Sequence, residues 1–173
     1  MKITQLRGDL TAFRNLELSI VLNAMKTENS RKPVSTLRQD IPYLTPQTKS
    51  LAAEKIPVVL FGATLKRDVE KVGVVSYTGL VLLSIGNLIG KAEAAGVRRR
   101  VAGFPQTLAC FIGSSGRSIK VVIPFTLPDG LLPETEEQIR FFHAHAYLRA
   151  SRYYEAQLQH TDEITLFKEL FIR

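Results

Sequence analysis

A glycine-rich turn between two apolar runs is the feature that most constrains the fold of this 173-residue chain. Residues 113–120 (GSSGRSIK) follow the apolar run 108–112 and precede the β-branched run 121–123. Apolar, β-branched runs joined by turn-forming residues predict two antiparallel strands, over 107–112 and 120–125, connected as a hairpin. The chain should therefore contain an antiparallel sheet.

The same turn has the composition of a phosphate-binding site. Glycine lets backbone N–H groups approach an anion closely because it has no Cβ, and Arg117 and Lys120 add positive charge. The candidate phosphate- or nucleic-acid-binding residues of the turn are Ser114, Ser115, Gly116, Arg117, Ser118 and Lys120. The alternative is a tight hairpin turn that binds no ligand.

Outside the hairpin, strand-like and helix-like segments alternate irregularly. This order predicts an α+β fold, with a mixed or mostly antiparallel sheet and helices packed on it. In the first half of the chain we expect an edge strand over 1–6, a helix over 16–25, short helices broken by prolines over 26–54, a strand over 56–61 and a charged loop over 62–73. A strand over 74–85, kinked near Thr78 and Gly79, and a helix over 87–100 with Asn87 as N-cap should follow.

After the hairpin we expect a long helix that begins at a capping box over 135–138, and a final strand or short helix over 165–172; one stripe of the long helix carries Ile139, Phe142, Ala146, Ala150 and Tyr153.

A second informative segment lies upstream of the hairpin, at residues 78–88 (TGLVLLSIGNL). A strand of this kind, then a helix, then the turn with its SG pair and lysine resembles the VirE N-terminal domain family, a branch of the archaeo-eukaryotic primase (primase-polymerase) superfamily found in bacterial mobile elements. Residues 1–6, 55–62 and the helix around 143–155 resemble further family segments. The resemblance implies a primase-polymerase-like sheet with an RRM- or ferredoxin-like core. Together with the order of the two motifs, it implies that the strand ending at Ile85 and the turn at 113–120 are neighbours on one face of that sheet. We expect one domain over 1–173, with 1–54 as a helical N-terminal extension. Because the resembled family continues past the last residue, two alternatives stay open: a trimmed domain of a longer protein, or a natural end.

Ser84 and Gly86 occupy the two positions where the resembled family places aspartates. Carboxylates at i and i+2 of a strand share one face and can hold two divalent metal ions for phosphoryl transfer. The hydroxyl of Ser84 and the hydrogen atom of Gly86 cannot replace these two carboxylates. The sequence therefore predicts a degenerate metal motif with no metal and no cofactor. Magnesium or manganese would enter only if the domain were an active enzyme. By the resemblance, Asp162 is the remaining catalytic candidate and Lys168 stands at a family arginine position.

The formal net charge of +7 suits a polyanionic partner. Arg98, Arg99 and Arg100 are candidates for contact with nucleic acid, although a solvated helix end would also favour arginines. We expect no signal peptide, no membrane partner and a bacterial cytoplasmic location, where the single Cys110 is a buried, reduced thiol. The three histidines lack metal-ligand spacing, so no zinc site is expected.

Three functions remain open from the sequence. The first is a catalytically degenerate primase-like domain that binds nucleic acid or nucleotide phosphates, within a mobile-element replication protein that also contains helicase or primase domains. The second is an active nucleotidyltransferase that uses Asp162 with Asp9, Asp40 or Asp68. The third is a protein-interaction or scaffold module. The sequence does not indicate an oligomeric state.

Overall fold

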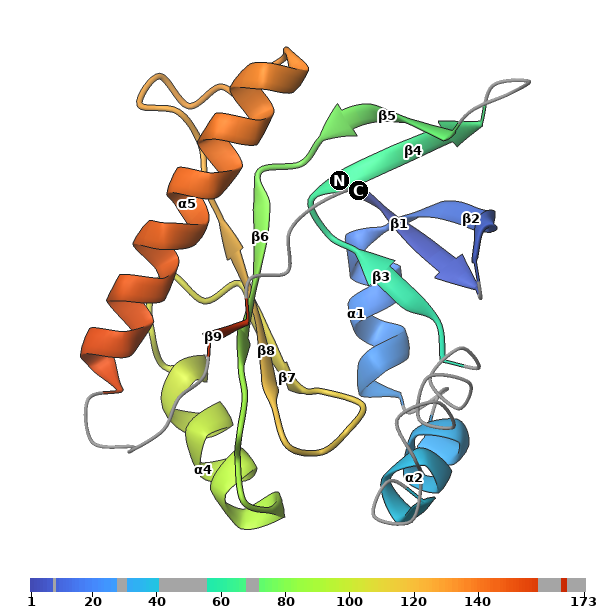
Figure 1. Cartoon of the computed structure of the whole chain (residues 1–173), viewed down its shortest axis with the longest axis vertical. Helices are drawn as coiled ribbons and strands as arrows, with labels where there is room; N and C mark the ends of the chain where they lie inside the picture. The colour runs from blue at the N-terminus through green and yellow to red at the C-terminus, as the bar shows by residue number, and fades with distance from the viewer. Residues whose placement is uncertain (8, 28–30, 41–55, 68–71, 159–165, 168–173) are drawn as a thin grey trace. The chain divides into compact units, whose positions relative to one another are not determined.

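The computed structural model describes residues 1–7, 9–27, 31–40, 56–67, 72–158 and 166–167 (Figure 1). In these residues the chain forms four helices and three small antiparallel sheets, so the expected α+β class is confirmed. The chain divides into two compact units, Met1–Thr78 and Gly79–Arg173, which are described separately as the first and second units.

The first unit opens with a three-stranded sheet of order β2-β1-β3. Its strands are β1 (Lys2–Arg7), β2 (Asp9–Glu17) and β3 (Val58–Leu60). Strand β1 is therefore central, and its expected position at the edge was wrong because β2, which mixes polar and apolar residues, was not predicted. Helix α1 (Leu18–Lys26) follows β2 directly and confirms the helix expected at 16–25. A second helix, α2, spans Arg31–Asp40.

The other sheet of the first unit pairs β4 (Ala63–Arg67) with β5 (Val72–Tyr77). The charged loop expected over 62–73 was therefore wrong. Strand β4 buries its first three residues and exposes Lys66 and Arg67, so its charges mark one end of a strand.

A hydrogen-bond network in the first unit satisfies backbone groups of β4. The β4–β5 register shifts between Thr64 and Leu65. The Leu65 N–H donates to the Thr4 hydroxyl at 3.0 Å, and the Asn15 amide donates to the Leu65 carbonyl at 2.8 Å. Thr4 in turn donates to the Asn15 side-chain oxygen at 2.6 Å. Side chains from β1 and β2 thus bond both backbone groups of Leu65 beside the irregularity.

The second unit has the element order β-α-β-β-α-β. Its elements are β6 (Leu80–Ile85), α4 (Lys91–Ala102), β7 (Ala109–Ile112), β8 (Ile119–Pro124), α5 (Glu136–Gln157) and β9 (Leu166–Phe167). The strands are ordered β7-β8-β6-β9 and every pair is antiparallel. This split arrangement is the ferredoxin-like topology, as expected for the core of the sheet.

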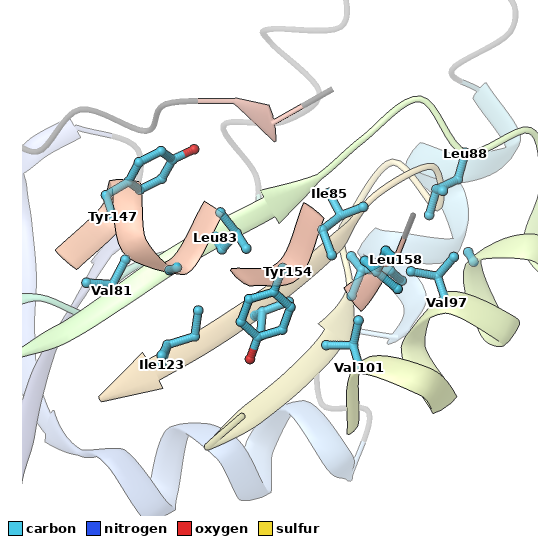
Figure 2. Packing of buried hydrophobic residues seen from close by; sticks show 14 of the residues in the cluster. Val81, Leu83, Ile85, Leu88, Val97, Val101, Ile123, Tyr147, Tyr154 and Leu158 are labelled. Atoms are coloured by element: carbon cyan, nitrogen blue, oxygen red, sulfur yellow. The ribbon is translucent and has the colours of Figure 1, made fainter. Parts of the chain in front are cut away.

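The core of the second unit lies between one face of this sheet and helices α4 and α5 (Figure 2). Alternation along the strands turns Val81, Leu83 and Ile85 of β6 toward the helices. The same face of β8 contributes Ile119, Val121 and Ile123. Because these side chains are almost fully shielded from water, burial of apolar area is the main stabilising interaction of the unit.

Helix α5 begins at the expected capping box, in which Thr135 accepts from the Gln138 N–H and Gln138 accepts from the Thr135 N–H. The expected stripe was partly wrong, since the residues that are buried are His143, Ala146, Tyr147, Ala150, Ser151 and Tyr154. Phe142 and Tyr153 are half-buried at the border of the core. The buried face of the helix therefore differs from the predicted one, because the prediction counted only apolar residues as inward-facing and left out His143 and Ser151.

Two turns near β6 differ from their predicted form. The strand expected over 74–85 is two strands in different sheets, separated at Gly79, whose φ of 72° favours glycine. Helix α4 starts at Lys91 with Gly90 as N-cap, so the expected cap at Asn87 was wrong. Asn87 instead takes a left-handed backbone conformation, with φ of 59°.

Candidate functional site

The hairpin and the end of β6 lie side by side in the second unit. The register places Ser84 directly opposite Lys120, and Ile85 opposite Ile119. Beyond the paired strands, the Leu88 N–H donates to the Arg117 carbonyl at 3.2 Å. The predicted proximity of the two sequence segments is therefore confirmed, and Gly86 follows Ile85 at this end of the sheet.

The hairpin turn uses several of its own backbone N–H groups. Gly113 N–H donates to the Ser118 carbonyl at 2.8 Å, and Gly116 N–H donates to the Gly113 carbonyl at 2.9 Å. The Arg117 N–H lies 3.3 Å from the Ser115 hydroxyl. The turn was expected to offer free backbone N–H groups to a phosphate, whereas these three donate within the turn. The exposed Arg117 side chain is consequently the clearest remaining candidate for anion binding in the turn.

The glycines of the turn have structural reasons for their identity. Gly116 has φ of 75°, in the region that favours glycine. A Cβ on Gly113 would collide with the Ser118 hydroxyl oxygen. The turn geometry thus requires glycine at Gly116, whereas the Ser118 hydroxyl could rotate away from a side chain at Gly113.

A row of three side chains crosses the sheet next to the turn. Phe111 pairs with Lys120, and Lys120 pairs with Ser84, so β7, β8 and β6 each contribute one residue. Because Ile119 and Val121 point into the core, these three residues belong to the opposite face of the sheet. Phe111 and Lys120 are half-buried, and Ser84 is buried. Sequence reasoning missed Phe111, although strand alternation from Gly113 would have placed it beside Lys120.

Ser84, which stands at an aspartate position of the resembled family, is buried. A neutral hydroxyl can be buried at small cost, whereas an unpaired carboxylate at this 3% exposed position would be strongly disfavoured. Among the side chains that the structure describes, no three of His, Cys, Asp or Glu gather closely enough to hold a metal ion. Asp162 and Lys168 lie outside the described residues, as do the side chains of Asp9 and Asp68.

The arginine triplet lies at the carboxyl end of α4. Arg98, Arg99 and Arg100 are all exposed. The Arg100 guanidinium donates to the carbonyl of Gln157, the last residue of α5, at 3.3 Å. A cation at a helix carboxyl terminus interacts favourably with the helix dipole. Arg100 therefore has a structural role, in line with the solvated helix end considered from the sequence.

Two titratable groups near the helices are shielded from water to different degrees: the Cys110 thiol is half-buried, not buried as expected, and His143 is buried. Burial raises the pKa of the Cys110 thiol, an effect that Arg98 partly offsets, and the thiol donates to the Arg98 carbonyl at 3.6 Å. Burial lowers the pKa of His143 to about 4. Both groups are thus held neutral near pH 7, which suits a structural role in the packing.

The topology and the hairpin row define the second unit as a ferredoxin-like α+β domain with an aromatic and a cationic side chain adjacent on one sheet face. A comparison with protein families matches residues 51–165 to the BT4734-like, N-terminal domain family. Since the match covers more than half of the chain, the chain belongs to this family.

The family match corrects the expected membership of the VirE N-terminal domain family. The matching family is neither a VirE nor a primase family, so the primase assignment and the role in replication that depended on it were wrong. No curated protein and no solved structure matches the chain. Within the described residues, no helix is both long enough and apolar enough to cross a bilayer.

Proposed function

We propose that the second unit binds the phosphate backbone of a nucleic acid through a hairpin surface formed by Phe111, Arg117 and Lys120. The observation that carries this proposal is the β7–β8 register, which sets Phe111 directly beside Lys120. Arg117 is exposed on the turn that joins the same two strands. An aromatic ring adjacent to cations is the combination with which proteins stack a base while neutralising its phosphate.

The distribution of charge along the second unit supports a polyanionic ligand at this surface. Between residues 91 and 120 the only acid is Glu93, whose carboxylate accepts a hydrogen bond from the Ile89 N–H at 2.5 Å. The cations of this segment are Lys91, Arg98, Arg99, Arg100, Arg117 and Lys120. Acids instead concentrate over 129–137, at Asp129, Glu134, Glu136 and Glu137. The hairpin therefore belongs to the basic segment of the domain.

In this proposal the turn contacts the ligand through side chains and not through backbone N–H groups, so the expected mode of binding changes. Because Gly113 and Gly116 donate within the turn, specific recognition of a terminal phosphate by the backbone is not expected. Arg117 and Lys120 would track a continuous phosphate backbone with little sequence preference.

The single Cys110 thiol supports the bacterial cytoplasmic location expected from the sequence.

Salt dependence of binding tests the proposal. Fluorescence anisotropy of a labelled single-stranded DNA or RNA, titrated with the full chain at several salt concentrations, gives the slope of log affinity against log salt. Arg117→Ala and Lys120→Ala should each weaken binding to all sequences and reduce the magnitude of that slope by about 0.7, the value for one phosphate contact on a single strand.

Arg140→Ala provides a matched control with the same change of charge. Arg140 is 80% exposed and pairs with Glu136 on the first turns of α5, in the acidic segment, so its loss should leave the slope unchanged. Phe111→Ala should lower affinity without changing the slope, because stacking releases no counterions. Equal effects of Arg117→Ala and Arg140→Ala, or no binding at low salt, would refute the hairpin surface and favour the interaction-module function.

A further inference from the structure

The outer face of α5 exposes an apolar stripe that the proposed nucleic-acid site does not use. Phe141 is 69% exposed and Leu148 is 41% exposed, two large apolar side chains separated by two turns of helix. Between them lie Ala144 and His145, both exposed. The Phe141 and His145 rings contact each other with centroids 4.3 Å apart, so the helix itself holds the phenyl ring across the stripe.

Opposite charges stand at the two ends of this stripe. Glu137 precedes Phe141 by four residues, and Arg152 follows Leu148 by four residues. Residues spaced by three or four share one face of a helix, so these two charges continue the stripe in both directions. Both side chains are exposed. From Glu137 to Arg152 the outer face reads acidic, apolar, small and aromatic, apolar, basic, and the exposed Glu155 follows beyond Arg152.

When two copies of this stripe run antiparallel, the acidic end of each meets the basic end of the other, and apolar residues meet apolar residues. We propose that the outer face of α5 binds the same face of a second copy of this chain, with the two helices antiparallel. A two-fold axis passing between Ala144 and His145 would place Glu137 opposite Arg152 of the second copy. It would likewise place Phe141 opposite Leu148, and the small Ala144 opposite the His145 ring.

Charge complementarity selects a second copy as the occupant. A twofold interface contains each contact twice, so two Glu137–Arg152 pairs would flank a central apolar patch of four large side chains. The neighbouring Arg140 is already paired with Glu136 on its own helix, at 2.7 Å, and lies to one side of the stripe. It therefore adds no unpaired like charge to the centre of the proposed interface.

Charge exchange between the ends of the stripe tests the pairing directly. In sedimentation velocity on the full chain, the unmodified protein should show a concentration-dependent monomer–dimer equilibrium. Glu137→Arg alone, or Arg152→Glu alone, should weaken the dimer by about tenfold or more, since each dimer then contains two like-charge contacts. The double variant E137R/R152E should restore the original dissociation constant to within about threefold.

Disruption of the apolar centre provides the second arm. Phe141→Glu should abolish the dimer over the same concentration range while leaving the far-UV circular dichroism unchanged, because the side chain is exposed. Ile89→Glu introduces the same charge at an 88% exposed apolar residue outside α5 and should leave the dimer intact. A monomeric unmodified protein, a dimer that withstands Phe141→Glu, or a double exchange that is no better than either single one would overturn the proposal.

Discussion

In the second unit, side chains from α4, α5 and one face of the sheet pack into one continuous apolar core, whereas in the first unit Thr4 and Asn15 bond the backbone of β4 through polar groups. Both units are small antiparallel α+β structures that bury apolar side chains, and the first unit adds this polar network. Burial of apolar area is non-directional and tolerates modest rearrangement. A buried polar network is directional, and removal of one member leaves its partners unsatisfied.

The difference predicts how each unit responds to mutation. In the second unit the cost of a change should follow the volume removed from the core. In the first unit it should follow the number of backbone groups left without a hydrogen bond, even where the substituted side chain is partly exposed. Three measurements, in order of decreasing effect, test this contrast.

Tyr154→Ala should cause the largest loss of stability. Tyr154 is 1% exposed, its ring contacts Phe104 at 5.5 Å between centroids, and its hydroxyl lies 2.6 Å from that of Thr107. We expect a loss of about 3 to 5 kcal/mol in urea unfolding, because a large cavity forms in the core. Tyr154→Phe, which keeps the ring, should cost only about 1 kcal/mol. Similar costs for the two variants would mean that the hydroxyl pair, not the core volume, stabilises this region.

Asn15→Ala should destabilise the first unit by about 2 kcal/mol, an effect out of proportion to the burial of its side chain. The change removes the donor to the Leu65 carbonyl and the acceptor for the Thr4 hydroxyl. Hydrogen exchange of amides in β1 and β4, followed by mass spectrometry, locates the effect. Gln5→Ala, which breaks only the exposed pair with Arg14, should stay within about 0.5 kcal/mol of the unmodified protein. A cost for Asn15→Ala as small as that of Gln5→Ala would argue against the polar network.

His143 should give the second unit the smallest of the three effects, a stability loss in acid. Burial lowers its pKa from 6.5 to about 4, so between these pH values the unfolded chain binds a proton that the folded one does not. Stability should therefore fall by about 1 to 2 kcal/mol as the pH falls from 6.5 to 4, and this contribution should level off below pH 4. His143→Gln should flatten the dependence of thermal stability on pH in this window. An unchanged profile would show that other groups control the acid response.

Much of the second unit could be predicted from its sequence because apolar periodicity determines it. The runs at 108–112 and 121–123 predicted β7 and β8, and the capping box at Thr135 predicted the start of α5. Their order relative to residues 78–88, together with the arrangement of the resembled family, also predicted that Ser84 and Lys120 would be neighbours. The interior of a hairpin turn was less accessible, since composition cannot show that Gly113 and Gly116 donate within it.

The first unit was harder to predict because its strand pairing and its polar bonds join residues that are distant in the sequence. Strand β2 alternates poorly, and the pairing that makes β1 central depends on residues distant in sequence, such as Leu60 opposite Thr4. The bonds from Asn15 to Leu65 span 50 residues and have no local signature. The family assignment failed differently: short motifs in the expected order were attributed to a primase-related family, whereas the family match is to the BT4734-like, N-terminal domain.

Strand β9 comes last among the described strands of the second unit but pairs with β6, the first of them (Figure 1). While a ribosome makes α4, the hairpin and α5, one edge of β6 at Ser84 and Ile85 has no strand to pair with. Nascent chains with an open, apolar strand edge associate with one another and recruit chaperones. Closure of the sheet over so long a loop also slows folding. The last few residues to form this sheet thus govern how long each newly made molecule remains vulnerable to aggregation.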